Sequence, residues 1–209
     1  IMFWNGAVSS LLSRKGSAVL TRMPISVAIF VLLGIEQIRQ QARDSFASTV
    51  SGVDLIVGAK TGSLNLLLYS VFRIGSPTDN ISWQAYRDIA DSDDVAWAIP
   101  ISLGDSHQGY RVVGTTQAFF EYFSFGKKRR LAFFEGEAFE STFDAVLGSE
   151  VASTLGYSVG TEIILAHGLA STSFTKHDNQ PFVVVGVLAP TGTPVDQTIH
   201  VRLEGIEAM

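Results

Sequence analysis

The sequence predicts an α+β protein in which a long N-terminal helix, which spans a membrane and continues as a stalk, precedes a mixed-sheet extracytoplasmic domain with two lobes. Two observations support this prediction. Residues 1–35 contain no Asp or Glu and end in the apolar run 23–35 (MPISVAIFVLLGI), whereas 36–209 has the composition of a polar-surfaced domain. In that domain, helical and extended patterns interleave without regular βαβ spacing, which favours mixed sheets.

The apolar run is long enough to cross a membrane only together with the residues before it. A hydrocarbon core needs about 20 helical residues, and 16–35 supplies them while including Arg22 and Pro24. Arg22 lies near one end, where a long side chain reaches the headgroups. Arg14 and Lys15 precede the span, so the positive-inside rule places the N-terminus in the cytoplasm and the bulk of the chain outside. A buried helix of a soluble protein and a cleaved signal peptide are the alternatives.

Helical periodicity continues beyond the apolar run. Apolar side chains recur at spacings of three and four, at Ile35, Ile38, Ala42, Phe46 and Val50. One helix over 16–50 would measure about 52 Å at 1.5 Å per residue, and it would tie the membrane mechanically to the domain. We assign this coupling to five stalk residues: Ile38, Arg39, Ala42, Arg43 and Phe46. The predicted divisions are an interfacial segment and transmembrane helix at 1–35, a stalk at 36–52 and a core domain at 53–209.

Capping and breaking residues bound the helices of the core domain. Ser63 begins an apolar helix that Gly75 and Pro77 end, and Ser82 caps the next helix before an acidic turn. Ser149 caps a further short helix. The predicted helices are 63–74, 83–90, 117–123 and 150–155.

Apolar and β-branched runs define the strands. The strongest is 182–188 (FVVVGVL), and 198–203 alternates between polar and apolar residues. Gly104, Asp105 and Ser106 form the turn that we expect between two of the strands. The predicted strands are 53–57, 95–103, 110–114, 145–147, 162–166, 182–188 and 198–203, and 168–180 is a polar loop.

The sequence gives no support for catalysis or cofactor binding. The nearest approach to a phosphate-binding loop, 52–61, has five residues between its glycines and places Ala59 before Lys60, which departs from G-x4-G-K-[ST]. The four histidines are scattered, without the close ligand pair of a zinc site, and the glutamates around Gly136 are interpreted as a solvated turn. With no Cys and a formal net charge of -5, thiol chemistry and nucleic-acid binding are disfavoured too. We expect no enzyme and no catalytic, cofactor or metal site.

One basic run interrupts the acidic domain, and aromatic residues flank it. Cations interleaved with aromatic rings suit anionic lipid headgroups or an acidic partner. The alternative is a solvated loop between two packed segments. The candidate lipid or partner contact consists of Lys127, Lys128, Arg129 and Arg130.

Four stretches together carry a family resemblance. They are an anchor and stalk at 14–43 followed by SGVDLIVG at 51–58, RVVGTT at 111–116 with Phe119 after it, AVLGSEVASTLGYSVGTEI at 145–163, and FVVVGVL at 182–188. The last two contain a G-x-x-V-A-x-x-L-G turn, a V-G-x-x-I strand and an F-x-V-V-G-V strand. In this order, the set resembles the periplasmic core of the MacB/FtsX-like permeases of bacterial ABC transporters.

The resemblance implies a permease subunit of the bacterial inner membrane. Such a subunit pairs with an ATP-binding subunit, which hydrolyses the ATP, and with a second permease copy as a dimer. Its periplasmic domain couples ATP-driven motion to export or extraction of a lipoprotein, peptide or drug, or to switching of a periplasmic partner. The family has three further helices after this domain, which we expect to be missing from this chain. The alternative from another class is a membrane-anchored extracytoplasmic sensor or ligand-binding domain; an anchored hydrolase would need a catalytic set that the sequence lacks.

Overall fold

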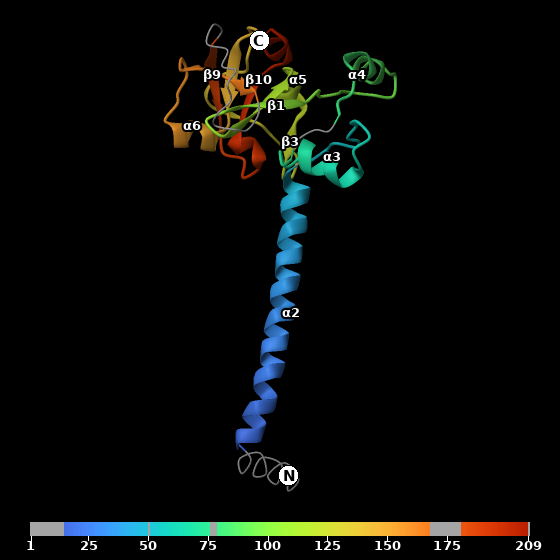
Figure 1. The fold of residues 1–209 in the computed structure, drawn as a ribbon, viewed down its shortest axis with the longest axis vertical. Coiled ribbons are helices and arrows are strands. Elements are labelled where there is room, and N and C mark those ends of the chain that lie inside the picture. The colour runs from blue at the N-terminus through green and yellow to red at the C-terminus, as the bar shows by residue number, and fades with distance from the viewer. Residues whose placement is uncertain (1–14, 50, 76–78, 168–180, 209) are drawn as a thin grey trace. The chain divides into compact units, whose positions relative to one another are not determined.

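Helix α2 (Lys15–Thr49) is the first element of the computed structural model, which describes residues 15–49, 51–75, 79–167 and 181–208 (Figure 1). It is continuous over 35 residues although Pro24 lies inside it. Its segment Val19–Gln40 has 22 residues and a mean hydropathy of 1.8, so it is long and apolar enough to cross a membrane, and the window of highest hydropathy contains no buried residue. The predicted long N-terminal helix is confirmed. The predicted interfacial residues 1–13 and the polar loop 168–180 lie outside the described residues.

The chain divides into two units, Ile1–Phe46 and Ala47–Met209, and we call the second one the body. Its helices are α3 (Ser63–Ser70), α4 (Trp83–Ala90), α5 (Ala118–Tyr122), α6 (Ser149–Leu155), the 3₁₀ helix η1 (Pro194–Gln197) and α7 (Leu203–Glu207). Its strands are β1 (Ser102–His107), β2 (Tyr110–Thr115), β3 (Ser124–Phe125), β4 (Arg129–Arg130), β5 (Phe133–Gly136), β6 (Asp144–Leu147), β7 (Glu162–Ile163), β8 (Ala166–His167), β9 (Phe182–Leu188) and β10 (Thr198–Arg202). Within the body, α3 and α4 lie to one side of the strands (Figure 1).

The main sheet mixes parallel and antiparallel pairs. Among the described residues its order is β5-β9-β6-β10-β2-β1-β8, with β7 paired to β9, and β3 and β4 form a separate hairpin. Strand β10 lies parallel to β2 and antiparallel to β6, and β6 lies parallel to β9. This arrangement confirms the predicted α+β class with mixed sheets.

Both faces of the sheet are buried, because alternate residues of each strand enter different apolar clusters. On β6, Ala145 and Leu147 join a cluster that includes Val151 of α6, whereas Val146 joins the aromatic cluster of Phe119. Two further aromatic residues of that second cluster, Phe123 and Phe125, lie just before the basic run; the cluster consists of Phe119, Phe123, Phe125, Phe139, Val146, Leu188 and Val195. The aromatic residues that precede the basic run therefore pack into the core, whereas Phe134 after the run is 79% exposed.

His200 of β10 packs against the second cluster. It is fully buried, and its ring centroid lies 4.8 Å from that of Phe119. Burial lowers the pKa of His200 to about 3, so its imidazole is neutral at physiological pH. For this histidine, the expected packing role is confirmed.

Several predicted boundaries are wrong. Residues 53–57 form no strand, and Leu55 is 74% exposed, because no neighbouring strand pairs with this apolar run. The strand predicted at 95–103 begins only at Ser102 and continues through the expected turn at 104–106. The chain turns instead at Gln108 and Gly109, whose φ angles of 50° and 85° give a two-residue hairpin that matches the twist of β1 and β2.

Helix ends and one strand also differ from the prediction. Ser82 does cap α4, since its side chain accepts a hydrogen bond from the Ala85 N–H, but Gly62 and Gly148 are the N-caps of α3 and α6 in place of Ser63 and Ser149. The predicted helix 63–74 ends at Ser70. The supposed solvated turn around Gly136 includes strand β5, which pairs with β9 while its glutamate stays exposed.

Candidate functional site

The chain enters the body beside strand β3. The Ser51 N–H donates to the Ser124 carbonyl oxygen at 2.9 Å, and the Ser124 hydroxyl donates to the Ser51 carbonyl oxygen. Thr49, at the end of α2, is 4% exposed within the body. Gly52 has a φ of 79°, a left-handed conformation that suits glycine. We call Thr49, Ser51 and Gly52 together with the β3–β4 hairpin the junction.

The basic run forms the turn and second strand of this hairpin. Phe125 pairs with Arg129, and the Arg129 guanidinium lies 4.5 Å from the centroid of the Phe125 ring. Arg130 donates a hydrogen bond to the Glu121 carbonyl oxygen of α5. The run is exposed, as the alternative of a solvated loop expects, but only Lys127 and Lys128 form a turn, and Arg129 and Arg130 are paired with β3.

The four basic residues are all exposed, but they differ in their contacts. The Arg129 guanidinium lies over the ring of Phe125, and Arg130 donates a hydrogen bond to α5. Lys127 and Lys128 form the turn of the hairpin, and Lys128 has a φ of 56°. A point charge at the tip of a tight turn is accessible to an anionic surface. A lipid or partner contact at this position stays a prediction.

The structure places the five stalk residues on α2. Ile38 is 68% exposed, and Arg39 forms an ion pair with Glu36 at 3.5 Å. The backbone of α2 is helical at Ala42, Arg43 and Phe46, whose side chains lie outside the described residues. Helical continuity through these positions is confirmed, and their role in coupling remains a prediction.

Sequence reasoning missed the pairing of Ser51 with Ser124. These residues are separated by 73 positions, and neither belongs to a sequence motif that predicts such a contact. The only related signal was the aromatic flank of the basic run, since Phe123 and Phe125 fix the hairpin onto the core. The structure thus brings the chain that leaves α2 and the basic run together at one site.

Replacing the hydroxyl of Ser124 tests the strength of the junction. Ser124→Ala removes a side-chain hydrogen bond to Ser51 and is expected to lower the free energy of unfolding by about 1 kcal/mol. Ser153→Ala is the control, because Ser153 is exposed and its hydroxyl donates to a carbonyl of its own helix, and it should change stability by about 0.5 kcal/mol or less. Urea unfolding of the full chain in detergent measures both. Equal losses would show that the junction contact contributes nothing specific.

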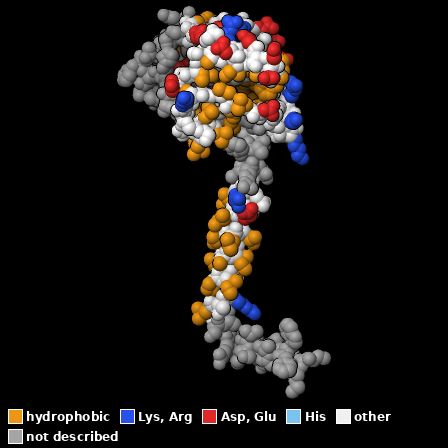
Figure 2. Space-filling view, turned by 90° about the vertical axis from the view of Figure 1, so that its right-hand side faces the viewer, with side chains coloured by type: hydrophobic (Ala, Val, Ile, Leu, Met, Phe, Trp, Pro, Cys, Tyr) orange, Lys and Arg blue, Asp and Glu red, His pale blue; other side chains and the backbone are white. Residues whose placement is uncertain are grey.

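Exposed apolar side chains occur in both units. Figure 2 shows them along α2, where Leu20 and Phe30 are 75% and 78% exposed, as expected for a lipid-facing helix. The figure also shows apolar side chains on the face of the body that includes α3 and α4. Exposed apolar residues of these helices and their adjoining segments are Leu55, Val57, Leu64, Ile74, Ile81 and Trp83.

An apolar helix long enough to span a membrane precedes a mixed-sheet body, an arrangement that is consistent with a membrane-anchored α+β domain. The chain matches the family described as MacB-like periplasmic core domain over residues 20–207, and it belongs to this family. The resemblance to MacB/FtsX-like permeases is thereby confirmed, and the family indicates a permease of the ABC-transporter type. The comparison with curated proteins gives no match.

Proposed function

We propose that this chain is the permease subunit of a bacterial ABC transporter of the MacB/FtsX type, and that its body couples ATP-driven motion to export or extraction of a lipoprotein, peptide or drug. The observation that carries the proposal is the family match, which runs from the apolar helix through the last strand of the sheet. ATP hydrolysis belongs to a separate ATP-binding subunit, and the chain itself is not an enzyme.

The proposed coupling runs along α2. The helical backbone is continuous from Lys15 to Thr49, and in this proposal it passes a displacement at the membrane end along the chain toward the body. The Ser51–Ser124 hydrogen bonds would then move β3, and Arg130 would pass the displacement to α5 through Glu121. Because Phe119 of α5 is buried in the second cluster, the proposed displacement would reach the core of the body.

The proposed location is the bacterial inner membrane, with the N-terminus in the cytoplasm and the body in the periplasm. Arg22, inside the candidate span, lies near the end that the positive-inside rule assigns to the cytoplasm. Lys127 and Lys128 would meet anionic headgroups or an acidic periplasmic partner. The exposed apolar face with Leu55, Leu64 and Trp83 suits the second permease copy of a dimer.

Affinity purification of the full-length gene product from its native membrane tests the proposal. We expect an ATP-binding subunit to co-purify, and the ATPase activity of the mixture to require that subunit. A preparation without such a subunit, even after mild cross-linking, would contradict the permease function. The anchored sensor would then take its place, and a cavity on the body is the observation that favours it.

A further inference from the structure

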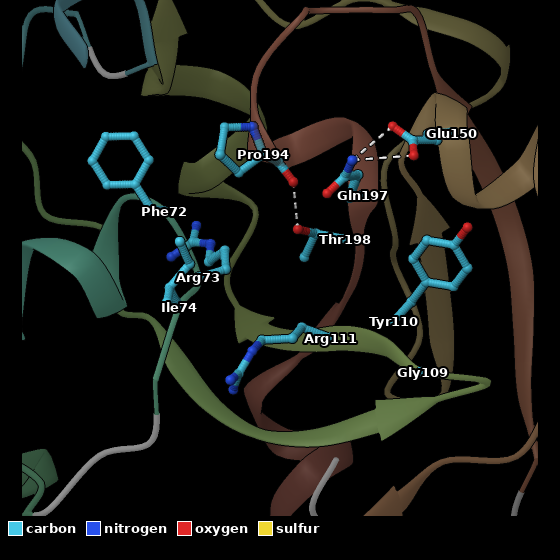
Figure 3. A pocket seen from close by; sticks show the side chains of 10 residues that line it. All are labelled: Phe72, Arg73, Ile74, Gly109, Tyr110, Arg111, Glu150, Pro194, Gln197 and Thr198. Atoms are coloured by element: carbon cyan, nitrogen blue, oxygen red, sulfur yellow. Dashed lines mark hydrogen bonds between the residues drawn. The ribbon is translucent and has the colours of Figure 1, made fainter. Parts of the chain in front are cut away.

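A pocket of about 320 Å³ lies on the body, away from the residues of the junction (Figure 3). It lies between the segment after α3, the hairpin of β1 and β2, helix α6 and η1, and this volume falls at the lower end of the range for small-molecule sites. Figure 3 shows Arg73 and Arg111 on one side, and Glu150 with Gln197 on the other. The polar residues that line it include Arg73, Tyr110, Arg111, Glu150, Gln197 and Thr198.

Arg73 is a buried cation without an acidic partner among the described residues. It is 9% exposed, and its guanidinium donates a hydrogen bond to the Ser70 carbonyl oxygen. No carboxylate in the described part of the chain forms an ion pair with it. Burial lowers the pKa of Arg73 to about 10, so the guanidinium still carries its proton at neutral pH. A buried charge of this kind is costly unless an opposite charge compensates it.

The backbone adds a second observation at the same residue. Arg73 has a φ of 60°, a left-handed conformation that an L-residue with a long side chain rarely adopts. Strained backbone of this kind tends to occur at binding sites, where it aims a side chain. Here Arg73 is one of the residues that line the pocket.

Arg111 supplies a second guanidinium to the same side. It is half-buried, and it donates to the Gly75 carbonyl oxygen at 2.5 Å, which leaves further N–H groups for a ligand. On the opposite side, the two carboxylate oxygens of Glu150 accept hydrogen bonds from the Gln197 amide at 3.1 and 3.0 Å. These bonds hold the carboxylate of Glu150 beside η1. The pocket therefore has a cationic end in a chain whose net charge is -5.

We propose that this pocket binds an oxyanion, the carboxylate or phosphate group of a small ligand, between the guanidinium groups of Arg73 and Arg111. Guanidinium groups present paired N–H donors whose spacing matches the oxygens of both groups. The hydroxyl of Thr198 donates to the Pro194 carbonyl oxygen at 2.7 Å, so this hydroxyl already has an acceptor within the protein. The charge of the ligand is therefore set by the two arginines. This site does not depend on the transport role, because its residues belong wholly to the body.

Equilibrium binding of inorganic phosphate and of acetate to the full chain in detergent tests the site. We expect saturable binding of at least one of the two anions. Arg73→Gln and Arg111→Gln should each weaken it by about tenfold or more, because each removes charge-assisted hydrogen bonds. Tighter binding of phosphate would identify a phosphate-bearing ligand, and tighter binding of acetate a carboxylate-bearing one.

Arg87→Gln is the matched control, since Arg87 is an exposed arginine of α4 outside the pocket. It removes the same charge from the body and should leave the affinity unchanged. The proposal is overturned if neither anion binds saturably, or if all three variants bind as the parent chain does. Far-UV circular dichroism of each variant checks that the fold is retained. If Arg73→Gln alters the fold, Arg111→Gln alone tests the site.

Discussion

Gly186→Ala is expected to lower the free energy of unfolding of the body by about 3 kcal/mol or more, because a methyl group has no room at this position. A Cβ atom at Gly186 would lie 2.2 Å from the Glu137 carbonyl oxygen and 3.1 Å from the Glu137 backbone nitrogen. These atoms are backbone, so no side-chain rotation relieves the contact.

The surrounding strands also prevent a shift. Gly186 pairs with Gly136 of β5 on one side and with Val146 of β6 on the other. The Glu137 N–H donates to the Val185 carbonyl oxygen at 3.1 Å, which fixes the chain that the new methyl group would displace. Gly136 is equally close to β9, since a Cβ there would lie 2.0 Å from the Val185 carbonyl oxygen. The close approach of β5 and β9 thus depends on a glycine in each strand.

Urea unfolding of the full chain, followed by tryptophan fluorescence, measures the effect. Gly104→Ala is the control, because Gly104 lies in β1 with ordinary backbone angles and nothing within 4 Å of a Cβ. The control is expected to change stability by about 0.5 kcal/mol or less. A Gly186→Ala protein as stable as the control would show that β5 does not pack against β9 as described.

Ala42→Pro is expected to remove most of the transport activity while the partner subunit still binds ATP. Position 42 lies well inside α2, where proline removes a backbone hydrogen bond and clashes with the preceding turn at a cost of about 3 kcal/mol. A kink there interrupts the rod between the span and the junction. Transport of the native substrate in reconstituted vesicles measures the loss, and nucleotide binding to the partner is measured in parallel.

Ala42→Gln is the matched control for this substitution. Glutamine is a good helix former, so it changes the side chain and leaves the helix intact. Normal transport in Ala42→Gln with loss in Ala42→Pro would assign the effect to helix continuity. Undiminished transport in the proline variant would show that α2 carries no motion to the body.

The sequence predicts those parts of the fold whose signal is local. The run at 182–188 is predicted as a strand from its apolar and β-branched residues alone, and β9 begins and ends at the predicted residues. Helix α4 also occupies the predicted span, because Ser82 supplies a cap within the same segment. The long helix follows from periodicity and composition, and α2 differs from the predicted 16–50 by one residue at each end.

The parts that escape prediction depend on contacts between distant residues. The run 53–57 has the composition of a strand but pairs with no strand among the described residues, whereas β5 (FFEG) is only four residues long, ends at the glycine that was interpreted as a turn and pairs with β9. The junction depends on two serines, and the cationic end of the pocket joins Arg73 to Arg111 across 38 positions of the sequence (111 minus 73). No local pattern contains such pairings, because they form only when the fold brings segments that are distant in the sequence together.

A distance measurement tests the proposed coupling most directly. Since the chain contains no Cys, Lys127→Cys introduces a single spin-label site on the exposed turn of the junction hairpin. The distance between the labels of the two permease copies is measured in the assembled transporter by pulsed electron resonance, with and without ATP. If motion passes along α2, ATP shifts the distance distribution in the Lys127→Cys protein, and adding Ala42→Pro abolishes the shift. An unchanged distribution with ATP, or a shift that survives the proline, would show that α2 does not couple the membrane to the body.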